Sequence, residues 1–366
     1  MYLQKIALFD FKNIEQAEIQ FCPKLNCFLG DNGAGKTNLL DAIYYLSFTK
    51  SFFNSIDSFN IRHGREMFMI QGKYERLGED ENISAGIKHG FKKQFKRNQK
   101  VYKKLSEHIG LFPLVMISPS DSVLILGGSD ERRKFMDGVI SQFDRNYLDA
   151  LLRYNRTLLQ RNNLLKHFSE TRSFDEDTLS VYDEQLADFG KIIYEKRKAF
   201  IDAMIPVFQK FYEFVSGGKE KVVLKYESTL DDGNINQQFA DNRAKDRASQ
   251  YTNIGIHKDD LFLGLGEFPI KKLGSQGQTK TYLIALKFAQ FEYLKNEGEI
   301  KPILLLDDIF DKLDVNRVGK IIELVSDDQF GQIFITDTNR EHLESILNKM
   351  DTDYRIYKIE EGRVAD

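Results

Sequence analysis

The segment GDNGAGKT, residues 30–37, constrains this chain more than any other part of it, because it fits the pattern G-x-x-x-x-G-K-[ST]. An apolar segment, residues 25–29, precedes it, and a segment of helical character, residues 35–46, follows it. Glycines at these places let the backbone curl so that its N–H groups point inward at phosphate oxygens. A glycine-rich turn that arose by chance would not have a strand and a helix on its two sides. The sequence therefore predicts a phosphate-binding loop in an α/β fold.

The residues of this loop have separate expected tasks in holding ATP. Lys36 supplies positive charge to the β- and γ-phosphate oxygens, and the hydroxyl of Thr37 is placed to ligate Mg²⁺. ATP and Mg²⁺ are therefore the expected cofactors. The expected ATP-binding residues are Gly30, Asp31, Asn32, Gly33, Ala34, Gly35, Lys36, Thr37 and Asn38.

A second motif, PILLLDDIFDKLD at residues 302–314, supplies acidic groups. Its isoleucine and leucine run reads as a strand buried on both faces, which ends on Asp307 and Asp308. Since successive strand residues point to opposite faces, we expect the two carboxylates to have different tasks. Asp307 is the expected partner of Mg²⁺ and Asp308 is placed to polarise the attacking water, so these two and Lys36 are the expected catalytic residues. An acidic turn after a strand is common by itself. The presence of a phosphate-binding loop in the same chain favours the interpretation that these aspartates are catalytic.

A third motif, GSQGQTKT at residues 274–281, precedes an amphipathic helical segment. Ser275 and Gln278 fit a capping box, which predicts a well-capped helix whose free N–H groups also form an anion site. The order of phosphate-binding loop, Ser-x-Gly-Gln, acidic strand and Leu-Asp is that of ABC-type ATPases, in which the signature of one subunit caps the ATP held by the other. We therefore expect an ATP-dependent homodimer. The signature residues expected to act on the partner's ATP are Ser275, Gln276, Gly277 and Gln278.

The segments around the motifs predict the elements of an ATPase head. Residues 2–9, 16–21 and 25–29 read as three short strands. Residues 60–102 alternate polar and apolar side chains between glycine turns, which predicts an antiparallel sheet.

The middle of the chain has a different character. Leucines recur at helical spacing from residue 148 to residue 165, and a second periodic segment covers about 182–215, where Pro206 predicts an interruption. The polar residues 231–253 read as a surface connection or mobile segment. The predicted fold is thus an α/β, ABC-type ATPase head with an inserted helical lobe and no long coiled coil. The expected division is residues 1–135 with 250–366 as the head and 136–249 as the lid-like lobe.

Composition limits the partners and the compartment. The only two cysteines, Cys22 and Cys27, cannot make a disulfide framework and indicate a reducing compartment. The first residues carry charges where a signal peptide needs apolar ones, and no apolar run reaches the ~18 residues that span a membrane. We expect a cytoplasmic protein with no membrane partner. The net charge of -3 gives no overall basic character, so any nucleic acid must be bound by a local patch.

One such patch is predicted between residues 88 and 104, which hold eight basic residues and no acidic one. A stripe of this kind neutralises phosphates without reading bases, and its binding falls with salt concentration. A run of like charges is more often only a solvated face, so this interpretation stays open. The expected DNA-binding residues are Lys92, Lys93, Lys96 and Arg97.

Beyond these motifs, nearly the whole chain resembles the bacterial RecF family of recombination mediators. The resemblance includes DFKNI near the start, KRNQKVYKKLSEHIG, SPSDSVLILGG and the late segment QIFITDTN. SDERRKFMD at residues 129–137 and GIHKDDL at 255–261 are more specific to that family than the ATPase motifs. The sequence leaves the tasks of Arg132, Arg133 and His257 open.

The resemblance implies a function in DNA repair, recombination and replication. It implies ATP-dependent dimerisation, weak DNA-stimulated ATP hydrolysis, and binding of single-stranded, gapped or junction DNA. It also implies cooperation with RecR and RecO in loading RecA onto DNA.

The chain departs from the family pattern at several places. The family usually has Arg where this chain has Lys12 and Lys280, and Glu where it has Asp41. Lysine keeps the charge but loses the two-pronged donor, which puts a bidentate phosphate contact there in doubt. Residues 50–55 lack an Arg that the family often has. Residues 336–338, Thr-Asp-Thr, stand where transporter ATPases place a switch histidine, which favours the DNA-repair branch.

Two other classes of protein are alternatives to this interpretation. An ATPase subunit of a transport or other non-DNA machine should have a switch histidine and a glutamine loop, and the sequence shows neither clearly; SPSD at residues 118–121 is the candidate replacement for that loop. A nuclease with an ABC-like head should have a separate acidic domain, for which we expect no room in 366 residues.

Overall fold

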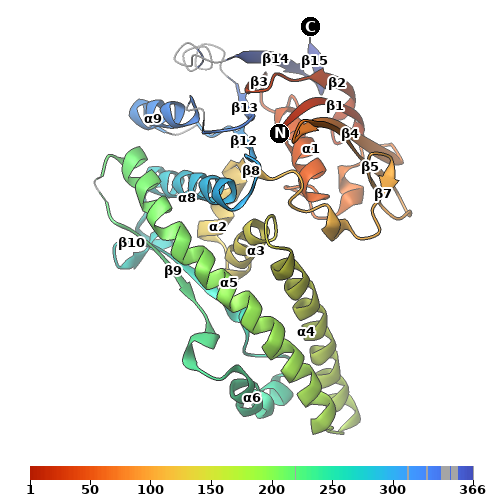
Figure 1. Ribbon diagram of the computed structural model, residues 1–366, viewed down its shortest axis with the longest axis vertical. Helices are drawn as coiled ribbons and strands as arrows, with labels where there is room; N and C mark the ends of the chain where they lie inside the picture. Colours follow the sequence, from red (N-terminus) through yellow and green to blue (C-terminus); the bar gives the residue numbers. More distant parts are fainter. Residues whose placement is uncertain (219, 311–312, 327–328, 339–346, 348–352, 366) are drawn as a thin grey trace. The chain divides into compact units, whose positions relative to one another are not determined.

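The computed structural model describes residues 1–218, 220–310, 313–326, 329–338, 347 and 353–365. The chain forms two compact units. Unit 1 comprises Met1–Asp121, Phe211–Gly217 and Lys280–Asp366, and unit 2 comprises Ser122–Lys210 and Gly218–Thr279. Figure 1 shows the elements of both units along the chain.

Unit 1 contains a mainly parallel sheet that carries the phosphate-binding loop. Its strands lie in the order β15-β14-β3-β13-β12-β8, and only β15 pairs antiparallel. The predicted strands at residues 25–29 and before Asp308 are confirmed, and every residue of β12 is buried. The strand bounds are Leu25–Leu29 (β3), Leu114–Ile117 (β8), Ile303–Asp307 (β12), Ile333–Asp337 (β13), Tyr354–Glu360 (β14) and Arg363–Ala365 (β15).

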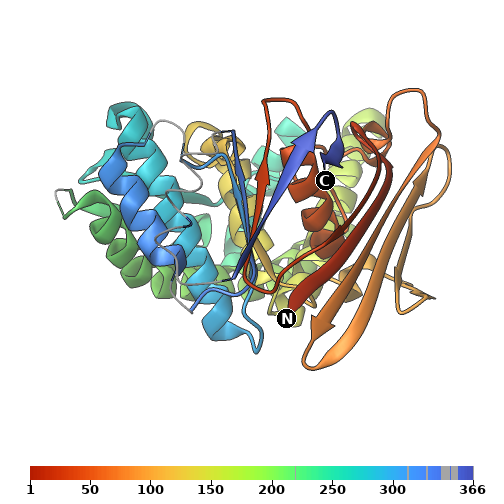
Figure 2. The ribbon, with the colours of Figure 1, turned by 90° about the horizontal axis from the view of Figure 1, so that it is seen from above.

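The second sheet of unit 1 is antiparallel, with the order β2-β1-β4-β5-β6-β7. Its strands β4 to β7 confirm the antiparallel sheet predicted for residues 60–102, and β1 and β2 extend it. Helix α1, Lys36–Phe48, lies between the two sheets (Figure 2), and its apolar side chains share one core with both. This arrangement anchors the start of α1, where the phosphate-binding loop ends. The strand bounds are Tyr2–Phe11 (β1), Ile14–Gln20 (β2), Met67–Arg76 (β4), Glu79–Lys88 (β5), Gln94–Arg97 (β6) and Lys100–Val101 (β7).

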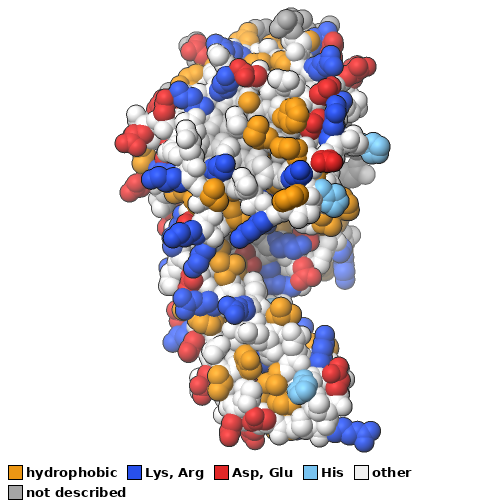
Figure 3. Space-filling model, turned by 90° about the vertical axis from the view of Figure 1, so that its right-hand side faces the viewer, with side chains coloured by type: hydrophobic (Ala, Val, Ile, Leu, Met, Phe, Trp, Pro, Cys, Tyr) orange, Lys and Arg blue, Asp and Glu red, His pale blue; other side chains and the backbone are white. Residues whose placement is uncertain are grey.

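The outer face of the antiparallel sheet is mixed in character. Phe9 and Met69 are partners across β1 and β4, and both are exposed. Figure 3 shows apolar side chains of this face among lysines, arginines and acidic residues. The inner face is mainly apolar, because strand residues alternate between the two sides, and its buried Glu81 is paired with Arg97.

Unit 1 also contains helix α9, Val315–Ser326, and the larger part of helix α8, Gln276–Glu297. Single-turn 3-10 helices lie at Asp57–Asn60, Leu105–Glu107 and Pro119–Ser122. No helix within the described ranges is long and apolar enough to cross a membrane.

Unit 2 consists of helices and a small antiparallel sheet of order β11-β10-β9. Its longest helices are α4, with 27 residues, and α5, with 41 residues, the last of which belong to unit 1. The bounds are Val123–Leu126 (α2), Ser129–Ile140 (α3), Arg145–Thr171 (α4), Glu176–Ser216 (α5), Val222–Glu227 (β9), Ile235–Ser249 (α6), Asp260–Leu265 (β10), Phe268–Pro269 (β11) and Ile270–Leu273 (α7), with 3-10 turns at Thr229–Asp232 and Ile256–Lys258.

Two sequence predictions about the middle of the chain are wrong. Pro206 does not interrupt helix α5 but lies inside it, between the buried Met204 and Phe208. Burial of the apolar side chains around the proline offsets the lost backbone hydrogen bond. The polar residues 231–253 are not an irregular connection, because most of them form helix α6, which buries Phe239 and Asp246.

The units also differ in their limits from the predicted head and lobe. The predicted limits were 1–135 with 250–366 and 136–249, whereas β10 and α7 lie in unit 2. The reason is local pairing: β10 pairs with β9 and contacts α3, and it belongs to neither sheet of unit 1.

Candidate functional site

The phosphate-binding loop joins strand β3 to helix α1. Gly33 and Gly35 have φ values of 82° and 113°, in the left-handed region that favours glycine. At Gly30, a Cβ atom would lie 2.2 Å from the carbonyl oxygen of Ile359, so only glycine fits there. Gly35 is the N-cap of α1 and provides no side-chain cap, which leaves the first N–H groups of the helix available to an anion.

Lys36 turns its ammonium group back over the loop. Its Nζ atom donates to the carbonyl oxygens of Gly30, at 2.6 Å, and of Asp31, at 2.9 Å. Burial lowers the pKa of Lys36, and the nearby carboxylates, first that of Asp308, oppose this effect. The lysine is thus desolvated while its hydrogen-bond acceptors are neutral, which suits the binding of phosphate oxygens.

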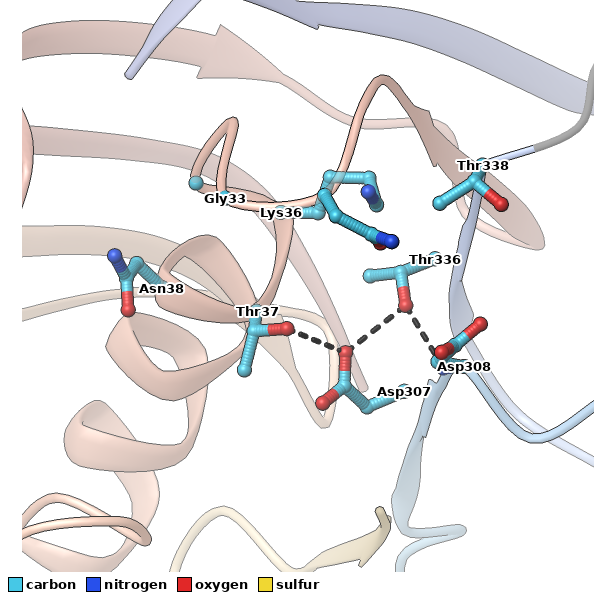
Figure 4. Close-up of a pocket in the computed structure, with 10 residues that line it drawn as sticks. Gly33, Lys36, Thr37, Asn38, Asp307, Asp308, Thr336 and Thr338 are labelled. Atoms are coloured by element: carbon cyan, nitrogen blue, oxygen red, sulfur yellow. Dashed lines mark hydrogen bonds between the residues drawn. The ribbon is translucent and has the colours of Figure 1, made fainter. Parts of the chain in front are cut away.

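Asp307 lies at the end of β12 opposite the loop (Figure 4). Its Oδ1 atom accepts hydrogen bonds from Thr37 Oγ1, at 2.8 Å, and from Thr336 Oγ1, at 2.9 Å. Its Oδ2 atom accepts a longer one, 3.4 Å, from Ser118 Oγ. Burial raises the pKa of Asp307. Ser118 thereby places SPSD, the predicted replacement for the glutamine loop, against this carboxylate.

Asp308 does not point away from Asp307 as strand alternation predicted. The strand ends at Asp307, and Asp308 has a φ of 48°, so the alternation stops there and both carboxylates line one pocket. The lining residues are Asn32, Gly33, Gly35, Lys36, Thr37, Asn38, Asp307, Asp308, Thr336 and Thr338.

The pocket gathers six of the nine predicted ATP-binding residues. The other three shape the loop: Gly30 and Asp31 hold Lys36, and the carbonyl oxygen of Ala34 accepts from the N–H of Gly362. The sequence did not single out Asn13, whose side chain donates to the Gly33 carbonyl at 3.4 Å and accepts from Asn38 at 2.7 Å. Its position in the segment DFKNI was the available signal.

The donors in the pocket fit Mg²⁺. Thr37 Oγ1 and Asp307 Oδ1 are both oxygen ligands, 2.8 Å apart, and Mg²⁺ is usually held by one or two protein oxygens together with phosphates and water. Within the residues that the structure describes, no cluster of three or more His, Cys, Asp or Glu could hold a metal ion without such help. A metal at this place would therefore arrive with the nucleotide.

The signature segment, residues 274–281, lies at the start of helix α8. Its residues up to Thr279 belong to unit 2, and those from Lys280 onward belong to unit 1. The predicted capping box is present: Ser275 Oγ accepts from the Gln278 N–H at 3.2 Å, and Gln278 Oε1 accepts from the Ser275 N–H at 2.7 Å. Gln278 also donates to Glu220, while Ser275 and Gln276 are exposed. The helix start is thus preorganised and open to solvent.

The two family-specific segments hold each other inside unit 2. Arg132 makes a two-pronged ion pair with Asp260, at 2.5 and 2.9 Å, and Arg133 donates to the Asp259 carbonyl oxygen at 2.5 Å. His257 contacts the Tyr154 hydroxyl at 2.8 Å through Nδ1, and burial lowers its pKa to about 4. All three residues that the sequence left open therefore have structural partners.

Two departures from the family pattern meet in one contact. Lys12 Nζ lies 2.6 Å from Asp41 Oδ2, and the Asp41 side chain is fully buried. Asp41 also accepts hydrogen bonds from Ser51 Oγ and the Phe52 N–H. Lysine and aspartate thus stand together where the resemblance implies arginine and glutamate, and Lys12 has a carboxylate partner rather than a free ammonium.

The predicted DNA-binding lysines and arginine divide into two pairs. Lys93 pairs with Asp57 at 2.7 Å, and Arg97 is held by both oxygens of Glu81. Lys92 and Lys96 make no ion pair with any other residue that the structure describes. Half of the predicted patch is therefore committed to the protein's own acids.

Comparisons with known proteins give one consistent result. Residues 2–365 match the model of the RecF/RecN/SMC N terminal domain. The DNA replication and repair protein RecF of Phocaeicola vulgatus is 56% identical, over 100% of this chain and 98% of that protein. The protein of the same name from Flavobacterium johnsoniae is 51% identical, over 98% and 100%.

Solved structures agree with the sequence comparison. The recombination mediator RecF with ATP, from the RecFOR pathway, has a TM-score of 0.89 and 31% identity, over 100% of this chain and 97% of that chain. An Smc head domain from Pyrococcus furiosus has a TM-score of 0.58 at 16% identity, which concerns the fold alone. The predicted fold class, an ABC-type ATPase head without a long coiled coil, is confirmed.

Proposed function

This chain belongs to the RecF family, and from that premise we propose that it is an ATP-binding recombination mediator that dimerises on ATP and acts on DNA. One observation carries the proposal: Lys36, Thr37, Asp307 and Asp308, which are far apart in sequence, line one pocket. The RecF structure named above holds ATP, which supports ATP as the nucleotide here.

Each residue of the pocket has a task in this proposal. Lys36 exchanges its carbonyl contacts for β- and γ-phosphate oxygens, and the helix N-terminus adds backbone donors. Thr37 and Asp307 hold Mg²⁺, which supplies charge neutralisation at the phosphates. Asp308 orients and polarises the water that attacks the γ-phosphate. Hydrolysis is expected to be slow and to be stimulated by DNA.

Dimerisation completes the site. The exposed Ser275 and Gln276 begin a helix whose N-terminus favours an anion, and the γ-phosphate held by a second copy is that anion. ATP thereby stabilises the closed dimer through contacts that ADP lacks, and hydrolysis releases it.

Replacing Ser275 tests the dimer. Ser275→Arg should leave ATP affinity within about twofold, because Ser275 does not line the pocket, and should abolish ATP-dependent dimerisation in size analysis. Val181→Arg places the same charge on an exposed position of α5 as a control. A Ser275→Arg protein that still dimerises with ATP would exclude the composite site.

DNA is the proposed partner of the dimer, in single-stranded, gapped or junction form, and RecR, RecO and RecA are the proposed protein partners. The family membership supports this, and Lys92 and Lys96, which make no ion pair within the described part of the chain, add local positive charge. Binding to gapped against blunt duplex DNA, with and without ATP, tests the preference. Equal binding to both duplexes in either state would count against junction recognition.

The ion pairs of Lys93 and Arg97 leave Lys92 and Lys96 as the better positions at which to test the basic patch. Lys92→Gln with Lys96→Gln should reduce the salt dependence of DNA binding by about two phosphate contacts, since these side chains make no ion pair with an acidic residue that the structure describes. Lys166→Gln with Lys245→Gln removes the same charge from exposed positions of unit 2 as a control. An unchanged salt slope in the first pair would remove the patch from the interface.

A further inference from the structure

We propose that Thr336 is a positioning residue for ATP hydrolysis, which holds the two pocket carboxylates in their working arrangement; this rests on the proposed function. Thr336 belongs to strand β13 and is only 1% exposed. It is the parallel-sheet partner of Asp307.

One hydroxyl group connects the carboxylate of Asp307 with the backbone of Asp308. Thr336 Oγ1 accepts from the backbone N–H of Asp308 at 2.9 Å and lies 2.9 Å from Asp307 Oδ1 (Figure 4). The Asp308 N–H can only donate, so the hydroxyl proton of Thr336 is free for Asp307. The direction of both hydrogen bonds is therefore fixed by chemistry.

The bond to the Asp308 N–H matters because of the backbone there. Asp308 has a φ of 48°, in the left-handed region that side chains other than glycine rarely adopt. This turn lets Asp308 line the same pocket as Asp307 instead of pointing to the other side of the sheet. Thr336 supplies the acceptor that stabilises the turn.

The hydrogen bond from Thr336 to Asp307 determines the orientation of the Asp307 carboxylate. Asp307 Oδ1 is shared by two hydroxyls, Thr37 on α1 and Thr336 on β13. Because the two hydroxyls come from different elements, they fix the orientation of the Asp307 carboxylate between the phosphate-binding loop and strand β13. Thr336 thus acts on hydrolysis through Asp307 and Asp308 and need not touch the nucleotide.

Kinetics of three variants test the proposal. Thr336→Val keeps the branched shape but removes the hydroxyl, and should lower kcat about 10- to 100-fold while KM for ATP changes less than about threefold. Thr336→Ser restores the hydroxyl and should keep kcat within about threefold. Thr157→Val is the matched control, because it removes another buried threonine hydroxyl, which donates to Gln185, from a position that does not line the pocket.

A kcat for Thr336→Val within twofold of the unchanged protein would overturn the proposal. So would an equal loss in Thr336→Val and Thr336→Ser, which would indicate a packing role. Failure of the proposed function is distinguishable, since it would be seen in the unchanged protein as absence of ATP binding or hydrolysis.

A crystal structure of Thr336→Val tests the geometry without any need for activity. We expect the φ of Asp308 to leave the left-handed region and its carboxylate to move out of the pocket. An unchanged φ and an unchanged carboxylate position would overturn the proposal.

Discussion

The nucleotide pocket of unit 1 and the interior of unit 2 use buried charges in opposite ways. In the pocket, Lys36 donates to backbone carbonyls and Asp307 accepts from hydroxyls, so each charge has neutral hydrogen-bond partners. In unit 2, the fully buried Arg161 contacts two carboxylates, those of Asp183 and Asp246.

A second arginine repeats the pattern of unit 2. Arg197 is 1% exposed and pairs with Asp137, at 2.8 Å, and with Asp259, at 2.9 Å. These pairs join helices α3 and α5 to the start of strand β10. The difference teaches that burial of a charge does not mark a binding site. A site is marked by buried charges whose partners leave capacity for a ligand.

The largest expected effect is in unit 2. Arg197→Met leaves Asp137 and Asp259 without their arginine, and should lower the free energy of unfolding by about 3–5 kcal/mol in urea titrations. Arg153→Met is the control, because Arg153 pairs with Asp149 on an exposed helix face, and should cost about 0.5 kcal/mol. Equal losses in the two variants would contradict the contrast.

The same contrast predicts an opposite result in the pocket. Lys36→Met removes a desolvated charge that bonds to backbone carbonyls and, among the described residues, to no carboxylate, so the free energy of unfolding should change by less than about 1 kcal/mol. ATP affinity should fall at least about 100-fold, or about 2.7 kcal/mol, when a fluorescent ATP analogue is titrated. A variant that unfolds as readily as Arg197→Met would show that Lys36 is also structural.

The two regions were not equally predictable from the sequence. The phosphate-binding loop is contiguous, so residues 30–38 carry their own geometry, and the acidic strand is recognisable by its apolar run. The contact between Thr336 and Asp308 depends on the pairing of two strands, and the left-handed turn at Asp308 has no glycine to signal it. Those details could not be predicted.

The buried ion pairs inside unit 2 could not be predicted from the sequence for a related reason. Asp246 lies 85 residues from Arg161, in a segment whose polar composition indicated a surface connection. Its burial is only visible once helices α4 and α6 are in contact. The same holds for Lys12 and Asp41, which depart from the family pattern at separate places in the sequence and are partners in the structure.

Unit 2 also contains a titratable group held neutral by burial. The pKa of His257 is lowered from 6.5 to about 4, mainly by burial, with smaller effects from the charges of Lys258 and Arg133. The unfolded chain therefore binds a proton between these two values that the folded chain does not, and stability falls as pH falls through this window. The loss from His257 should be about 2 kcal/mol between pH 7 and pH 5.

Substitution of the histidine isolates this effect. His257→Gln cannot titrate, so its urea midpoint should depend less on pH between 7 and 5 than that of the unchanged protein. His167→Gln, on an exposed position of α4, is the control. If His257→Gln and the unchanged protein lost stability in parallel, the histidine would not be the buried neutral group.

The smallest expected effect concerns an ion pair in unit 1 that is an exception to the contrast between the pocket of unit 1 and the interior of unit 2. Lys12 and Asp41 lie in unit 1, on the turn after β1 and on the phosphate-binding helix α1, yet they pair as the charges of unit 2 do. In a double-mutant cycle of Lys12→Met and Asp41→Asn, we expect a coupling of about 1 kcal/mol in the free energy of unfolding. ATP affinity should stay within about twofold, since neither residue lines the pocket. A cycle with no coupling, or a large loss of ATP affinity in Lys12→Met, would instead place Lys12 with Lys36 among the charges kept for a ligand.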